Sequence, residues 1–149
     1  MRALALATLA CIAAAPVLTE AEVRAFVARQ ERAWNAGDLD AYFAAFAPSA
    51  VFVDQARAND NSIVPYGRST LAEARRQSRR SFAKGGVSET GQVLGVQIAG
   101  ATARVSSYEV IRAGGRTSCA ERLQTLALQQ GRLRSTGQVD TVVRCRRAR

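Results

Sequence analysis

The chain has 149 residues, a formal net charge of +9 and a hydrophobic content of 48%. This length fits a single domain with a real core, and the apolar content excludes a disordered chain. No apolar run reaches the roughly 20 residues that a membrane-spanning helix needs, so we expect no transmembrane segment.

The first 15 residues have the pattern of a secretory signal peptide. Met1 and Arg2 form a short positive start, residues 3–15 are apolar, and small residues allow cleavage around Ala13 to Ala15. The alternative is an N-terminal helix of the mature domain, which is less favoured because this run has no polar face. We therefore expect a signal peptide at 1–15, one domain at 16–149, and a periplasmic or secreted protein.

The first helix is predicted from its start signal and its apolar stripe. Thr19 and Glu22 have the spacing of a capping box. Apolar residues then recur every three or four positions from Val23 to Trp34, as on one face of a helix. A single amide, Gln30, interrupts this stripe, so its side chain either faces a pocket or lies at the edge of the stripe.

A second helix and a short strand follow. Gly37 is expected to end the first helix, and Asp38 to cap a second helix whose apolar repeat reaches Phe46 and which Pro48-Ser49 ends. Residues 50–54 have the apolar density of a buried strand, whereas residues 55–65 are polar and rich in turn formers and are expected to form a loop.

The rest of the chain predicts one more helix and four strands. Thr70 and Glu73 form a second capping box, and the helix is expected to run to Phe82. Strands are expected at 87–98, 102–112, 116–128 and 132–144, separated by short turns that contain glycine. Short turns join neighbouring antiparallel strands, so the chain is predicted to be α+β, with helices on one face of a meander.

Two segments resemble a known superfamily. The segment WNAGDLDAYFAAFAPSAVFVD, residues 34–54, and the segment YGRSTL, residues 66–71, are similar to nuclear transport factor 2-like proteins. This superfamily includes ketosteroid isomerases and SnoaL-type polyketide cyclases. The resemblance implies a cone-shaped domain in which three N-terminal helices pack on a strongly curved, mostly antiparallel sheet. It also implies a pocket at the open end and a homodimer through the outer face of the sheet.

The resemblance assigns a candidate site. Asp54 aligns with the catalytic base of the isomerases, while Gln30 and Gln124 stand where those enzymes have their two hydrogen-bond donors. A carboxylate in a dry pocket can move a proton next to a ketone if donors stabilise the enolate oxygen. The alternative is that Asp54 is a strand-end carboxylate paired with an arginine.

The expected function is that of an exported domain that binds a small apolar or amphipathic molecule. The alternative is a cofactor-free isomerase, cyclase or hydratase with Asp54 as general base, and a third option is an accessory domain whose pocket its own side chains fill. Absence of His excludes nucleophile systems that depend on His. We expect no metal, no cofactor and no nucleic-acid partner. The residues expected to line the pocket are Gln30, Trp34, Tyr42, Phe46, Tyr66 and Gln124.

Two cysteines, Cys119 and Cys145, remain after signal cleavage, and in an exported protein a disulfide between them is expected. Their strand register leaves the geometry open. A two-residue turn at Gln130-Gly131 places Val142 opposite Cys119 and leaves Cys145 roughly 10 Å away. A longer turn, a bulge or a returning tail would close the gap.

Overall fold

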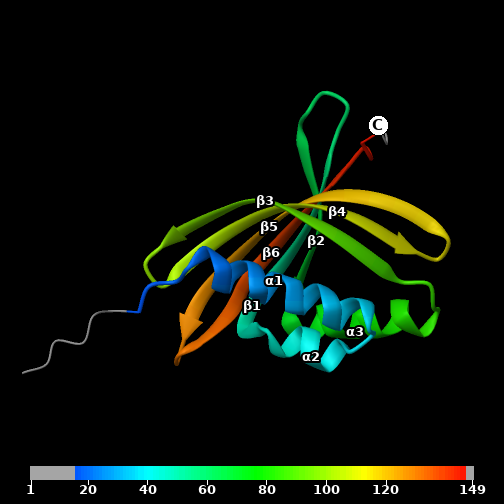
Figure 1. Cartoon of the computed structure of the whole chain (residues 1–149). Helices are drawn as coiled ribbons and strands as arrows, with labels where there is room; N and C mark the ends of the chain where they lie inside the picture. The colour runs from blue at the N-terminus through cyan, green and yellow to red at the C-terminus, as the bar shows by residue number, and fades with distance from the viewer. Residues whose placement is uncertain (1–15, 147–149) are drawn as a thin grey trace, which may run out of the picture.

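A computed structural model describes residues 16–146 (Figure 1). The expected signal peptide at 1–15 lies outside the described residues. Three helices lie together on one face of a curled sheet, as Figure 1 shows. These helices are α1 (Glu20–Asn35), α2 (Leu39–Ala44) and α3 (Leu71–Ala83).

The helices begin where their capping residues predict. Thr19 and Glu22 form the reciprocal capping box at the start of α1. The same arrangement, made by Thr70 and Glu73, starts α3. Gly37 follows α1 with a positive φ of 72°, a left-handed conformation that suits a residue without a side chain.

Six strands form one mixed sheet in the order β2-β1-β6-β5-β4-β3. The pair β1–β6 is parallel and the other four pairs are antiparallel, so the sheet is mostly antiparallel. The strands are β1 (Phe46–Arg57), β2 (Ile63–Thr70), β3 (Ser88–Ala99), β4 (Thr102–Ala113), β5 (Arg116–Gln129) and β6 (Arg132–Val143).

The predicted loop at residues 55–65 is wrong. Strand β1 continues to Arg57, turns through residues 58–62 and pairs with β2, which lies at the edge of the sheet. An edge strand tolerates Pro65 and polar residues because one of its sides needs no ladder partners. The predicted end of the second helix is also wrong, because α2 ends at Ala44 and Phe46 already belongs to β1.

The core consists of two apolar clusters. One contains the aromatic residues of α2 and β1 and includes Phe46, which is 1% exposed. The other lies between α1 and strands β4 and β5 and includes Val23, Val105 and Leu126. Helix α1 contacts β3 and α3 contacts β1 and β2, so the helices reach both ends of the sheet.

A disulfide ties the C-terminal segment to the sheet. The turn at Gln130-Gly131 has two residues, but a bulge at Thr125/Leu126 shifts the register so that Val143 lies opposite Cys119. The chain then returns and joins Cys145 to Cys119, with the two Cα atoms 5.1 Å apart. This segment lies at the same end of the molecule as the β1–β2 turn (Figure 1).

Candidate functional site

Two neighbouring cavities lie between the helices and the concave face of the sheet. The larger, which we call the Asp54 cavity, has a volume of about 210 Å³. The smaller, which we call the Gln30 cavity, has a volume of about 40 Å³, room for a few water molecules. Four residues line both cavities: Tyr42, Glu89, Arg122 and Gln138.

A buried arginine stands between the two cavities. Arg122 on β5 donates four hydrogen bonds, to Glu89 at 2.5 and 3.2 Å and to Asp140 at 2.7 and 2.9 Å. A third carboxylate, Glu109, lies 3.9 Å from Nη1. The Arg122 side chain is 12% exposed. We call these four residues the Arg122 cluster.

Two features position the carboxylates of the cluster. The side chain of Asn35, at the end of α1, donates from Nδ2 to the backbone carbonyl of Glu89 at 2.7 Å. Its Oδ1 accepts from the backbone N–H of Glu89 at 2.8 Å, and this pair of bonds fixes β3 against α1. Gly91 leaves room for Glu109, because a Cβ at residue 91 would lie 2.5 Å from Oε2 of that carboxylate. The Asn35 amide and the missing Cβ therefore place two of the three carboxylates.

Burial and like charge govern the electrostatics of the cluster. Burial alone would lower the pKa of Arg122, but the carboxylates of Asp140 and Glu89 outweigh it and hold the pKa well above its usual value. Burial raises the pKa of Glu109, although Arg122 and the hydroxyl of Ser107 oppose the shift. Burial likewise raises the pKa of Tyr42. The arginine is therefore permanently charged, and one cation faces three carboxylates.

The structure brings Gln30 and Gln124 together. Nε2 of Gln124 donates to Oε1 of Gln30 at 2.9 Å, and both side chains are buried, 5% and 6% exposed. Nε2 of Gln30 has no partner among the described residues. The two amides line the Gln30 cavity, whereas Asp54 lines the Asp54 cavity, so the three residues do not face one common space.

Asp54 has no arginine partner among residues 16–146. Within the described part of the chain its carboxylate accepts no hydrogen bond and forms no ion pair. Burial raises its pKa, the nearby charge of Asp140 raises it further, and Arg122 opposes the shift. Gly67 on β2 lies opposite and makes room, because a Cβ there would lie 3.1 Å from Oδ2 of Asp54. The carboxylate is therefore half-buried and available.

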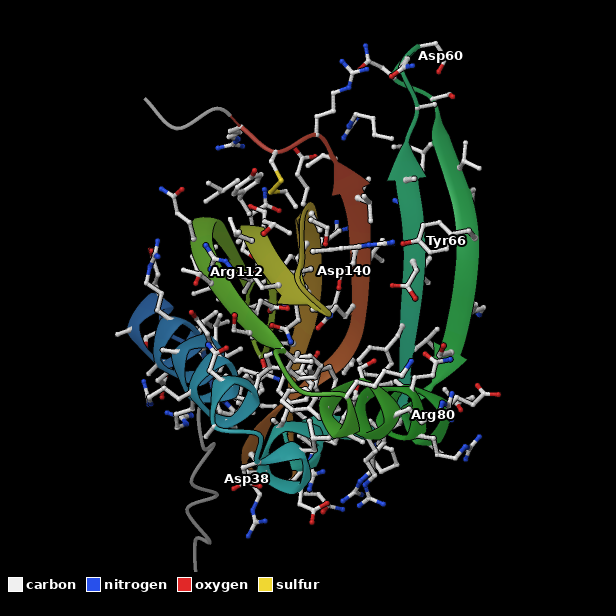
Figure 2. The ribbon with its side chains drawn as sticks, turned by 90° about the vertical axis from the view of Figure 1, so that its right-hand side faces the viewer. Asp38, Asp60, Tyr66, Arg80, Arg112 and Asp140 are labelled. Carbon is white, nitrogen blue, oxygen red and sulfur yellow. A yellow bond between two sulfur atoms is a disulfide. The ribbon has the colours of Figure 1, made fainter. Side chains whose placement is uncertain are left out.

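The other predicted pocket residues divide into two groups. Trp34 lines the Asp54 cavity, and its Nε1 hydrogen has no partner among the described residues. Tyr42 lines both cavities. Phe46 and Tyr66 lie elsewhere: Phe46 is in the core, and Tyr66 is 63% exposed on the edge strand β2, where Figure 2 shows it.

Comparison with known proteins gives the fold but no close relative. No protein-family model matches the sequence, and no curated protein has a significantly similar sequence. Solved structures do match. A nuclear transport factor 2-like protein of unknown function from Shewanella oneidensis is 15% identical, with 81% of this chain and 97% of that chain covered and a TM-score of 0.65. The chain has the nuclear transport factor 2-like fold.

Other proteins with this fold differ in what they do. A ketosteroid isomerase-like protein from Erwinia carotovora is 15% identical over 86% of this chain and 100% of that chain, with a TM-score of 0.63. The β subunit of a benzoate 1,2-dioxygenase from Burkholderia mallei is 13% identical over 85% and 91%, with a TM-score of 0.61. The fold therefore leaves the activity open, and the site must decide it.

Sequence reasoning missed the central residues of the site, Arg122 and Glu89. The signal for Arg122 was present, because side chains two residues apart share one face of a strand. Once Gln124 is placed toward the pocket, as the nuclear transport factor 2-like resemblance requires, Arg122 must point the same way. Glu89 gave no such signal, because the residue that orients it, Asn35, is 54 positions away.

Two further structural findings concern membrane spans and metal ligands. In residues 16–146, no helix is long and apolar enough to cross a membrane. Across the same residues, no three acidic, cysteine or histidine side chains are placed to share a metal ion. The groups that the site offers are an available carboxylate, a charged cluster, and unpartnered donor and acceptor atoms.

Proposed function

We propose that the protein binds a small organic molecule in the Asp54 cavity and acts as an exported ligand-binding domain of the nuclear transport factor 2-like type. The observation that carries the proposal is the cavity: about 210 Å³ of space, many times what one water needs, faced by an unpaired carboxylate. Trp34, Phe43 and Phe52 give it an apolar wall. Apolar walls with a few polar groups are typical of ligand sites.

The test is to fill the cavity and look for loss of ligand. Ala74 on α3 is buried and lines the Asp54 cavity, so Ala74→Leu should occupy the space, while Ala72→Leu on the exposed side of the same helix is the control. Native mass spectrometry of the exported protein should show a copurifying mass with the wild type and with Ala72→Leu, and none with Ala74→Leu. Ser78→Leu, at another lining position, serves if Ala74→Leu does not fold. A ligand that survives both changes lies elsewhere.

A second candidate function is proton transfer by Asp54. The observation that favours it is the raised pKa of an unpaired carboxylate, which suits a general base. Asp54 would take a proton from a carbon next to a carbonyl, and the electron pair of that bond would move into the enolate oxygen. Gln30 and Gln124 line the other cavity, so the donors of the Asp54 cavity would come from other lining residues, among them Trp34, Tyr42 and Ser69.

Deuterium exchange separates this enzyme from a binder. Wild-type protein in D₂O should speed exchange at the α-carbon of a small aryl ketone, and Asp54→Asn should abolish the effect while its far-ultraviolet circular dichroism stays the same. Exchange that persists in Asp54→Asn would remove Asp54 from the mechanism and with it the enzymatic proposal.

We also propose a periplasmic or secreted location and a homodimer through the outer face of a cone-shaped sheet. The disulfide between Cys119 and Cys145 supports an oxidising compartment. Two apolar residues, Val139 and Leu123, are paired across β6 and β5, and alternation along β5 puts Leu123 on the face opposite Arg122 and Gln124. Cell fractionation and sedimentation equilibrium test these two proposals, and a monomer at micromolar concentration would contradict the second.

A further inference from the structure

We propose that the ligand of the Asp54 cavity is an organic cation: an ammonium group carried on a small apolar or aromatic body. This inference rests on the proposed function, since it names the chemical class of molecule that the same cavity takes. Three observations support it: an excess of negative charge in the cavity, and a carboxylate and a buried acceptor that both lack partners among the described residues. All the residues concerned line the Asp54 cavity.

The charge of the cavities is opposite to that of the chain. The whole chain has 21 basic and 12 acidic residues. Of the described residues that line the two cavities, Arg122 alone is basic, while five are acidic: Asp54, Glu89, Asp140, Glu31 and Glu109. The first three line the Asp54 cavity itself. Buried carboxylates are costly unless a cation balances them, and one arginine cannot balance three.

The negative charge is concentrated where β1 meets β6. Asp54 and Asp140 are direct partners in the parallel register, so they point to the same face of the sheet, and Asp140 raises the pKa of Asp54. Like charges directly opposite each other destabilise a sheet. Asp140 is occupied by Arg122 and Gln138, but Asp54 has no partner among the described residues. A cationic ligand would relieve this repulsion.

Gln138 adds an acceptor that lacks a donor. Its side chain is 7% exposed and its Oε1 has no partner within the described residues, although it lines the Asp54 cavity. The orientation of the amide is fixed, because Nε2 donates to Oδ2 of Asp140 at 3.0 Å and a flip would set oxygen against the carboxylate. An ammonium group supplies the N–H donors that Oε1 of Gln138 and the carboxylate of Asp54 lack.

The aromatic residues that line the cavity indicate that the rest of the ligand is apolar or aromatic. Trp34, Phe43 and Phe52 line the same cavity, and aromatic rings hold both apolar groups and cations. The N–H of Trp34 has no partner in the described structure and would donate a hydrogen bond to an acceptor atom on that body. Since no three acidic side chains of the described residues are placed around one metal ion, the cation that fits is organic.

Three probes of equal size and different charge test the inference: benzylammonium, benzyl alcohol and benzoate. Each is titrated into ¹⁵N-labelled exported protein, and amide shifts around Asp54 and Gln138 report binding, which we expect in the millimolar range for molecules this small. Benzylammonium should bind at least tenfold more tightly than benzyl alcohol, and benzoate should bind most weakly.

Two variants assign the charge effect to the cavity. Asp54→Asn should reduce the tenfold preference for benzylammonium over benzyl alcohol to less than threefold. Glu20→Gln removes the same charge from the exposed surface and should leave the preference as it is. If benzylammonium and benzyl alcohol bind the wild type with equal affinity, the ligand is not an organic cation, but the binding function stands. A preference that survives Asp54→Asn would also overturn the inference of a cationic ligand. If no probe shifts the lining residues, and the cavity-filling variants retain any natural ligand, the binding function itself fails.

Discussion

Removing the cation of the Arg122 cluster should be the most damaging single change in the site. Arg122→Met keeps much of the side-chain volume but deletes four hydrogen bonds of 2.5 to 3.2 Å to Glu89 and Asp140. It also leaves a third carboxylate, Glu109, without the charge 3.9 Å away. Breaking a buried ion pair by removing one partner costs about 3–5 kcal/mol, because the remaining charge stays buried and unpaired.

The loss is a large share of the stability of a domain this size. Domains unfold at a cost of about 5–15 kcal/mol, so Arg122→Met should lower the urea midpoint at pH 7 sharply. At pH 5 the deficit should shrink, because burial raises the pKa of Glu109 and the variant lacks the Arg122 charge that opposes the shift, so this carboxylate takes up a proton more readily. The control is Arg24→Met, which removes an exposed ion pair with Glu20 and should cost less than about 0.5 kcal/mol.

Two results would refute this reasoning. One is an Arg122→Met variant that loses no more stability than Arg24→Met. The other is a deficit that is independent of pH, which would mean that lost packing rather than uncompensated charge is responsible. If Arg122→Met does not fold, Arg122→Lys tests the geometry alone, because it keeps the charge and loses the fork that holds two carboxylates at once. Its loss of stability should exceed that of Arg24→Met and should not shrink at pH 5.

Three further predictions concern other groups. Replacing Cys119 and Cys145 by Ala should cost about 3–4 kcal/mol in urea unfolding, since the bond closes a loop over a separation of 26 residues, and reductant should have the same effect on the wild type alone. Burial raises the pKa of Asp54 above its ordinary 3.8. Between 3.8 and the pKa in the folded state, the folded chain binds more protons at Asp54 than the unfolded chain, so stability falls as the pH rises through this range. Asp54→Asn should therefore be more stable than wild type at pH 7 and lose this advantage below pH 3.8; equal midpoints at both pH values would contradict the shift. Gln30→Leu should cost about 1–3 kcal/mol by orphaning Nε2 of Gln124, and adding Gln124→Leu should cost less than the sum of the two single changes; additive losses would mean the amides are not coupled.

The parts of the fold that the sequence could predict are those that depend on residues close together in the chain. The capping boxes at Thr19 and Thr70 and the stop at Gly37 lie where the helices begin and end. Capping satisfies donors within one helical turn, so a few residues decide it. Strand β2 was not predicted, because Pro65 and the polar residues that precede the strand indicate a loop. Its pairing with β1 depends on the turn at 58–62.

Only those site residues were predictable that share one face of a strand with a residue already assigned to the site. The resemblance named Gln30 and Gln124 as candidate donors, and alternation along β5 would have added Arg122. The carboxylates that Arg122 binds come from β3 and β6, 33 and 18 positions away in the chain. Nothing local marks such partners, because the contacts arise from how the sheet curls, and the same holds for the bulge that sets the register of Cys119.

The position of Asp54 and its chemistry have separate origins. Its place on β1 comes with the nuclear transport factor 2-like fold, and proteins with this fold include isomerase-like and non-isomerase chains. Its surroundings decide its chemistry. Gln30 and Gln124 line the other cavity, and Arg122, which stands between the two cavities, is saturated by Glu89 and Asp140. A site that stabilised an enolate would need free donors beside the base. Three carboxylates and one saturated arginine line this cavity, and that balance of charge favours binding a cation over making an anion.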